Sequence, residues 1–282
     1  MYAIHQSLLA AHISAGAIAL ASFWVPVFAR KGSPWHVKAG MLYSRCMIAV
    51  AWTAIALCAI IAIDPLGSHG VGAVAPERAA EIVSQSRLFA AFLAFLGLTT
   101  LSGIRNGLRA VKARREPGWR PTRGDVTLDL AVVASGLAML VMGLVYWNPL
   151  FIGLSLTVLI IRLMRVRRAS AQHFSWWSEH LSAMLGTGIG AYTAFFVFGG
   201  RRLFSAYLPG GWELLPWFLP TVIGIPAITL TIRYYRARFE PAGRPAPAVA
   251  GMDVRRKLGR ETVLGLLLAI LVFAPAMAGL LK

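Results

Sequence analysis

Long apolar stretches separated by short polar connections dominate the chain. Each stretch lasts about 17–25 residues, which is the length that a helix needs to cross about 30 Å of hydrocarbon. The pattern predicts eight membrane segments, at about 4–28, 39–63, 88–104, 126–147, 149–163, 177–198, 216–232 and 262–281. Open strands would leave backbone groups without hydrogen-bond partners in lipid. We therefore predict an all-α, polytopic membrane helix bundle that forms one transmembrane domain over residues 1–282.

The composition supports a membrane protein over other classes. The chain is 57% hydrophobic and 14% charged, whereas a soluble domain is about 45–50% apolar and about 25% charged. Cys46 and Cys58 are separated by about 18 Å of helical rise, too far for a disulfide, so we expect packed thiols. The first basic residue is Arg30, so the first segment lacks a signal peptide's positive start and is expected to remain as a helix.

The basic residues are distributed unevenly among the connections. A net charge of +17 in a soluble protein would suggest nucleic acid, but here the charges lie between apolar blocks, next to the lipid bilayer. Of the 28 Lys and Arg residues, 23 lie in or beside the odd-numbered connections. Because cytoplasmic connections carry the basic excess, we predict that both termini face outward, in a bacterial inner membrane, with no nucleic-acid partner.

Five of the six histidines lie in or beside the predicted membrane segments, where polar residues are costly and suggest function. They are His5, His12, His36, His173 and His180, and His69 lies in the outer loop. By helical rise, His12 is about 12 Å inside the outer surface and His180 about 5 Å inside the inner one, so these two cannot share an ion. The inner end can gather His36, His173 and His180 with Glu179 and Asp129. The outer end can gather His5, His12 and His69.

One interpretation of the inner cluster is a haem b site. Two axial imidazoles from different helices would hold the macrocycle, and His36 and His180 are the predicted ligands. His173 would be a substitute or supporting group, and His12 would contact a proton or quinol at the outer side. Small residues near His180, such as Gly186 and Gly190, would leave room for the haem, although they equally suit close helix packing. The protein would exchange electrons with a quinone or a redox partner.

A second interpretation is a divalent metal such as zinc at the inner end. His36, His173 and His180 would supply nitrogen ligands, and Asp129 or Glu179 would supply an oxygen ligand or a base. The spacing is not diagnostic of a known zinc motif. The alternative roles are structural: Asp129 as an acid in the first turn of its helix, and Glu179 as the partner of an arginine. A metallo-hydrolase would follow from the metal interpretation.

A third interpretation is a proton-coupled transporter of small molecules. His12 and Asp129 would titrate inside a cavity. The third segment ends in an unusually polar strip, which we expect to face the bundle interior; it comprises Thr99, Thr100, Ser102, Gly103, Asn106 and Gly107. Arg105 is expected to extend toward lipid phosphate. A non-catalytic assembly subunit is the remaining alternative.

Two stretches carry a family resemblance. The first runs from His12-Ile-Ser-Ala-Gly16 through Arg30-Lys31-Gly32-Ser-Pro-Trp-His36 to Gly40 and Tyr43. The second runs from Trp177-Ser-Glu-His180-Leu-Ser-Ala-Met184 to Tyr192-Thr-Ala-Phe195. Together they resemble an uncharacterised family of bacterial multipass membrane proteins, which is catalogued as a domain of unknown function. The resemblance covers about half of the chain and implies that His12, His36 and His180 matter, but it implies no reaction.

Overall fold

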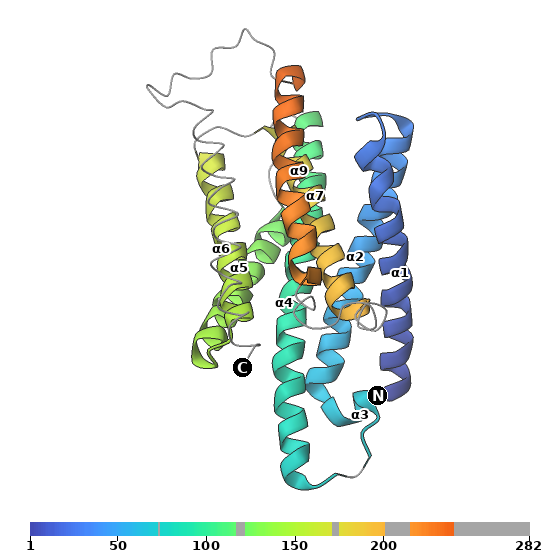
Figure 1. Ribbon diagram of the computed structural model, residues 1–282, viewed down its shortest axis with the longest axis vertical. Helices are drawn as coiled ribbons and strands as arrows, with labels where there is room; N and C mark the ends of the chain where they lie inside the picture. The colour runs from blue at the N-terminus through green and yellow to red at the C-terminus, as the bar shows by residue number, and fades with distance from the viewer. Residues whose placement is uncertain (73, 117–121, 171–174, 201–214, 240–282) are drawn as a thin grey trace. The chain divides into compact units, whose positions relative to one another are not determined.

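The computed structural model describes residues 1–72, 74–116, 122–170, 175–200 and 215–239. Within these ranges every regular element is helical and no strand occurs, which confirms the predicted all-α class. The elements are α1 (Tyr2–Phe28), α2 (Pro34–Ile63), α3 (Pro65–His69), α4 (Pro76–Arg115), α5 (Arg123–Val145), α6 (Pro149–Ser170), α7 (Trp176–Ala194), a π-helical turn η1 (Phe195–Gly199) and α9 (Leu215–Phe239) (Figure 1).

Six described helical stretches are long and apolar enough to cross a membrane, so the protein has the character of a multipass membrane protein. They are Tyr2–Phe28, Pro34–Ile63, Pro76–Arg115, Arg123–Val145, Trp176–Gly199 and Trp217–Arg236. The predicted fifth segment forms a helix, α6, and the predicted eighth segment at 262–281 lies outside the described residues. The count of eight spans and the outward termini stay predictions.

The largest difference from the predicted boundaries is in α4. Its 40 residues correspond to about 60 Å of helix, well beyond the predicted segment 88–104 and the bilayer core. Residues 64–87, which we expected to form an outer loop, contain α3 and the first turns of α4. The apolar pattern located the part of α4 within the membrane but not its polar ends, because good helix formers continue a helix into water.

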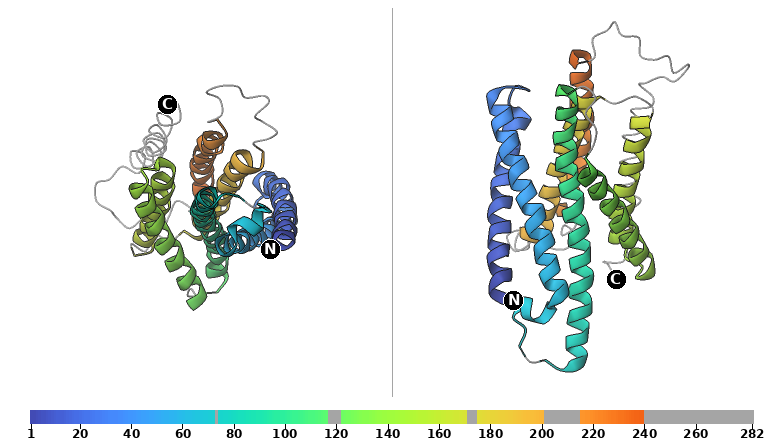
Figure 2. Two further views of the ribbon diagram at one scale, coloured as in Figure 1. Left: turned by 90° about the horizontal axis from the view of Figure 1, so that it is seen from below. Right: turned by 180° about the vertical axis from the view of Figure 1, so that it is seen from behind.

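Two compact units divide the chain, and the first comprises Met1–Arg105 and Pro121–Met139. In this unit α1 and α2 lie side by side (Figures 1 and 2), with the rings of Phe23 and Tyr43 5.4 Å apart. Helix α2 also packs on α4, where a Cβ on Gly97 would lie 3.2 Å from Ile55, so glycine permits the close approach. Cys58 is buried in this contact, and both thiols are free, as predicted.

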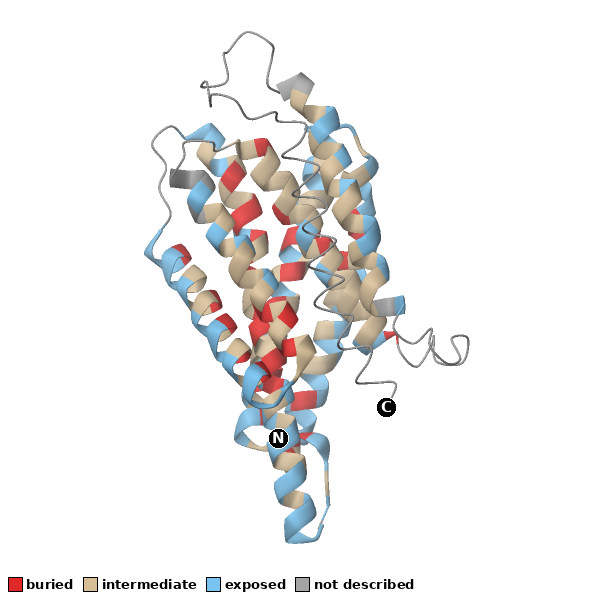
Figure 3. Ribbon diagram, turned by 60° about the vertical axis from the view of Figure 1, so that its left-hand side comes forward, coloured by how far each residue is buried: buried red, intermediate tan, exposed pale blue. Residues whose placement is uncertain are grey.

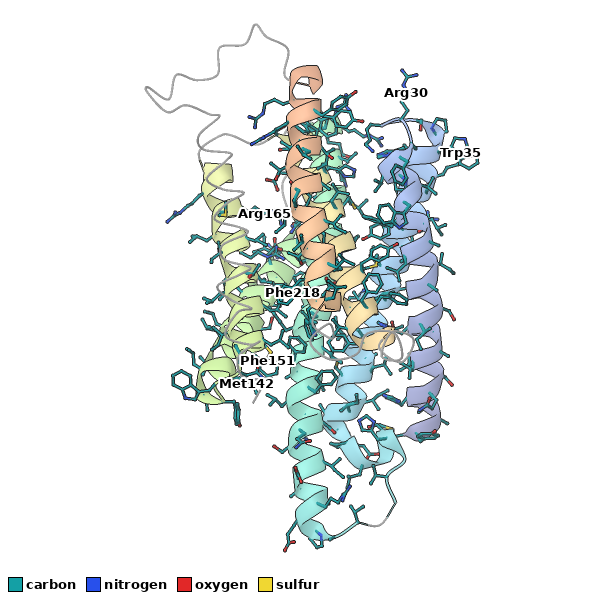
Figure 4. All side chains as sticks on the ribbon, viewed as in Figure 1. Arg30, Trp35, Met142, Phe151, Arg165 and Phe218 are labelled. Carbon is teal, nitrogen blue, oxygen red and sulfur yellow. The ribbon has the colours of Figure 1, made fainter. Side chains whose placement is uncertain are left out.

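The second unit comprises Asn106–Arg120 and Leu140–Lys282. Helices α5 and α6 are joined by a tight turn in which Asn148 Oδ1 accepts hydrogen bonds from the backbone N–H groups of Leu150 and Phe151. The turn lies where the predicted segments 126–147 and 149–163 meet, at Asn148-Pro149, because asparagine caps a helix and proline favours its first position. Figure 4 labels Met142 and Phe151 on the two sides of this turn. In the same unit α7 packs against α9, where Gly224 meets Ile189.

Helix α5 has one buried face and one exposed face, and both are largely apolar. Asp125, Val132 and Met139 are buried and recur on one face. Leu130, Leu137, Val141 and Leu144 are more than half exposed and follow another face. Figure 3 shows such exposed positions along the length of the helices and not only at their ends. An exposed apolar stripe of this length suits contact with lipid, and the buried stripe carries the carboxylate of Asp125.

Candidate functional site

His12 joins α1 to α2 inside the first unit. Its Nδ1 lies 3.0 Å from Thr53 Oγ1 and 3.1 Å from the carbonyl oxygen of Val50. The hydroxyl of Thr53 donates to the carbonyl oxygen of Ala49 at 2.8 Å, so its oxygen accepts from His12. Nδ1 therefore carries the proton, and Nε2 carries the lone pair. His12 lies ten residues after Tyr2, or about 15 Å along the helix.

His36 lies in the turn between α1 and α2. Its backbone N–H donates to Ser33 Oγ, which caps α2, and its Nδ1 lies 3.1 Å from the carbonyl oxygen of Pro26. Lys31 Nζ donates to the same oxygen and to Val27 O, at 2.8 and 2.7 Å. Burial lowers the pKa of Lys31. The predicted ligand thus helps to close the end of α1, whose last carbonyls need partners.

His180 lies in the second unit, on α7. Its Nδ1 lies 2.9 Å from the carbonyl oxygen of Gly107 on α4. A side chain on Gly107 would collide with Met184 and Ala183, so glycine lets α7 approach close enough for the bond. The neighbouring Glu179 accepts a hydrogen bond from Arg165 Nε at 3.3 Å, and Arg165 is labelled in Figure 4. This contact confirms that Glu179 pairs with an arginine, as one of the two interpretations predicted.

The predicted inner cluster combines residues of both units. His36 and Asp129 belong to the first unit, His180 and Glu179 to the second, and His173 lies outside the described residues. Among the residues that the structure describes, no three His, Cys, Asp or Glu side chains form a group that could hold a metal ion. The haem pair and the zinc cluster therefore stay predictions.

Among the described residues, the expected close packing of the small residues near His180 is not seen at Gly186 and Gly190. A Cβ on either glycine would have no described atom within 4 Å, and both positions are exposed. Close helix contact is instead seen at Gly107 and Gly224. Open space beside two glycines does not by itself define a site.

The densest polar contacts of the first unit link α4 to α5. Ser102 Oγ donates to Asp129 Oδ1 at 2.6 Å. One turn earlier on α5, Asp125 Oδ1 accepts from Arg105 Nε and Nη2 at 2.9 and 2.6 Å. Ser102 is fully buried and Asp125 is 2% exposed. The prediction that the polar strip of the third segment faces the interior is confirmed at Ser102, Asn106 and Gly107.

Two details of these contacts correct the sequence interpretation. The acid in the first turn of α5 is Asp125, not Asp129, because the helix begins at Arg123, before the predicted start. Arg105 is paired with Asp125 across the two helices, instead of only reaching toward lipid phosphate. The first difference arises because an apolar window places the helix start where hydrophobic residues begin and overlooks the polar first turn. The second depends on the register of α4 against α5.

Asp125 also forms a reciprocal cap with Thr122, which the sequence analysis missed. Asp125 Oδ2 accepts from Thr122 N at 3.0 Å and from Thr122 Oγ1 at 2.8 Å, and Thr122 Oγ1 accepts from Asp125 N at 3.2 Å. This is a capping box with Asp at its fourth position. The signal was present in the sequence as Thr122-Arg-Gly-Asp125 directly before an apolar run.

No known protein family, curated protein or solved structure matches this chain. The resemblance to an uncharacterised bacterial family stays a prediction, and the candidate site rests on the contacts described above.

Proposed function

We propose that this integral membrane protein is a proton-coupled carrier of small molecules in a bacterial inner membrane, and that Asp129 is its proton-binding group within the membrane. The observation that carries the proposal is the 2.6 Å hydrogen bond from Ser102 to Asp129. Asp129 lies six residues after Arg123, so helical rise puts it about 9 Å along α5. An ionisable residue at such a position is costly and indicates a function.

The hydroxyl of Ser102 is a suitable partner for reversible protonation of Asp129. A hydroxyl donates to an ionised carboxylate, and after rotation it accepts from the protonated acid. Ser102 therefore satisfies Asp129 in both states, without moving either helix. The guanidinium of Arg105 only donates hydrogen bonds, so it favours the ionised form of Asp125. The two acids are one turn apart on α5, and the hydroxyl of Ser102 accommodates both protonation states of Asp129.

His12 is the second group that can exchange a proton in the first unit. Its Nδ1–H is directed to Thr53 and Val50, so Nε2 is the atom that takes up a proton. Imidazole changes its charge near physiological pH. We assign His12 the relay of protons to or from the carrier's aqueous side, and Asp129 the coupling step.

Two measurements on the full-length protein test this proposal. In proteoliposomes with a trapped pH-sensitive dye, one solute class of a panel of amino acids, sugars and organic cations should induce proton flux. Asp129→Asn should abolish that flux. In infrared difference spectra recorded during a pH titration, the signal of a protonated carboxylic acid should be lost in the same variant.

The matched control is Glu81→Gln, which neutralises an exposed acid that bonds to Gln85 on the polar end of α4. This variant should keep both signals. Flux or an infrared signal that survives in Asp129→Asn at wild-type strength overturns the proposal, as does a folded wild-type protein that shows neither signal.

Haem ligation is the second candidate, because of the orientation of two imidazoles. His36 and His180 each direct Nδ1 to a backbone carbonyl oxygen, so Nε2 carries the lone pair, as in histidines that ligate metals. A haem b protein should show a Soret band that shifts on reduction, and His180→Ala should remove it. A colourless, folded protein after reconstitution with haem contradicts this candidate.

A further inference from the structure

The imidazoles of His5 and His69 face each other at the end of the first unit where α1 begins. Their ring centroids are 5.8 Å apart and their planes meet at 62°, an edge-on arrangement. His5 is 7% exposed, and its Nδ1 is buried without a hydrogen-bond partner among the described residues. His69 is exposed. Burial of a ring nitrogen without a hydrogen-bond partner is unfavourable, so a bound ligand at this position would recover part of that cost.

His69 is the last residue of the short helix α3, and hydrogen bonds stabilise both ends of this helix. At the start of α3, Asp64 Oδ1 accepts from Gly67 N at 2.9 Å. At its end, Gly70 adopts φ +66°, a left-handed conformation that favours glycine, and Val71 N donates to Leu66 O at 3.0 Å. The ring of Tyr2 packs over Gly70, where a Cβ would lie 3.2 Å from it. Helix α3 is thereby fixed against the first turn of α1 (Figures 1 and 2).

We propose that His5 and His69 form a two-histidine site for a first-row divalent transition-metal ion. Two imidazoles that bind one ion through bonds of about 2.0–2.1 Å have ring centroids roughly 5–6 Å apart, and the observed separation falls in that range. Imidazole nitrogens suit copper, zinc and nickel, and copper is bound most tightly in this series.

The site supplies two protein ligands. The part of the chain that the structure describes offers no third His, Cys, Asp or Glu to complete a group, so water fills the other positions. An ion could reach exposed His69 directly from solution, and the buried imidazole of His5 would supply the second ligand. The distribution of basic residues predicts that this end faces outward, so the ion comes from outside the cell. The site is independent of Asp129 and of the proposed carrier function.

Cu²⁺ titration of the full-length protein in detergent, followed by calorimetry and electron paramagnetic resonance, tests this site. The wild type should bind one ion per chain with hyperfine couplings from two imidazole nitrogens. His69→Ala should weaken binding by more than about tenfold, since loss of even a supporting partner of a ligand costs about 10–100-fold. Because His69 is exposed, its removal should leave the unfolding temperature unchanged. His5→Gln tests the buried ligand independently.

Glu81→Gln is the control, because it removes an exposed oxygen donor that is not part of this site, and it should leave Cu²⁺ binding unchanged. The proposal is overturned if the variant that combines His5→Gln with His69→Ala binds Cu²⁺ as tightly as the wild type. A wild-type spectrum without couplings from two nitrogens overturns it as well.

Discussion

Asp125 and Asp129 lie one turn apart on the same face of α5, and their surroundings differ. Asp125 accepts hydrogen bonds from a guanidinium and from the cap residue Thr122, whereas the hydroxyl of Ser102 donates to Asp129. Both carboxylates face α4 and belong to the first unit. Under the proposed function, this difference distinguishes a structural acid, Asp125, from a proton-binding acid, Asp129.

The comparison teaches that residue type and helix face do not by themselves define the role of an intramembrane acid. A cationic partner stabilises one charge state, and a capping role ties that state to the start of the helix. A neutral partner that both donates and accepts leaves the charge state open. Substitutions that change one set of partners at a time measure this difference.

The largest effect is expected for Asp125→Ala. Removing the carboxylate leaves Arg105 and Thr122 without their acceptor, and we expect the free energy of unfolding to fall by about 2–3 kcal/mol. The value is below that of a fully buried pair because the side chain of Arg105 is 45% exposed and water can solvate it. Chemical unfolding in mixed micelles, followed by circular dichroism, measures the loss. Asp129→Asn is the comparison, and an equal loss in both variants would remove the distinction between the two acids.

A smaller effect is expected for Ser102→Ala. It removes the hydroxyl that donates to Asp129, and the loss of a hydrogen bond to this half-buried carboxylate should cost about 1–2 kcal/mol. Ser155→Ala is a closely matched control, because Ser155 is also fully buried but its hydroxyl donates to carbonyls of its own helix, Phe151 O and Ile152 O. The same unfolding measurement compares the two variants. If Ser155→Ala is the more destabilising of the two, the contact between α4 and α5 is not the cause.

The smallest effect is expected for Thr122→Ala at the start of α5. Loss of the capping hydroxyl should lower the free energy of unfolding by about 0.5–1 kcal/mol, while Thr122→Ser should retain most of the stability. Thr127→Ala serves as the control, since its exposed hydroxyl donates to Arg123 O within the helix. Thermal unfolding followed by circular dichroism resolves the three variants. A serine variant as unstable as the alanine variant would show that the cap does not depend on the hydroxyl.

For the histidines, the sequence predicted their positions on helices but not their hydrogen-bond partners. The repeat of apolar residues placed His12 within a helix and His180 near the start of another, and both positions are confirmed. The spacing of apolar residues could not identify the partners of these histidines. Val50 and Thr53 are 38 and 41 residues from His12, and Gly107 is 73 residues from His180. The outer group was predicted to include His5, His12 and His69. The structure pairs His5 with His69, while His12 bonds to α2.

The capping box of α5 could be predicted from the sequence, since it is a local pattern of four residues. The pairing of Arg105 with Asp125 could not be predicted in this way, because it depends on the register of α4 against α5. Register is set by side-chain packing along both helices, such as the close approaches at glycines, and no single segment contains that information.

The sequence by itself determined that this protein is a helical, multipass membrane protein. Hydrophobic length and the need to satisfy every backbone group in lipid are properties of each segment alone, so they can be read without knowing its neighbours. Only the tertiary structure decided which acid is held by Arg105, which is bonded to Ser102, and which two histidines meet. These roles arise from contacts between helices, where a shift of one turn exchanges one partner for another.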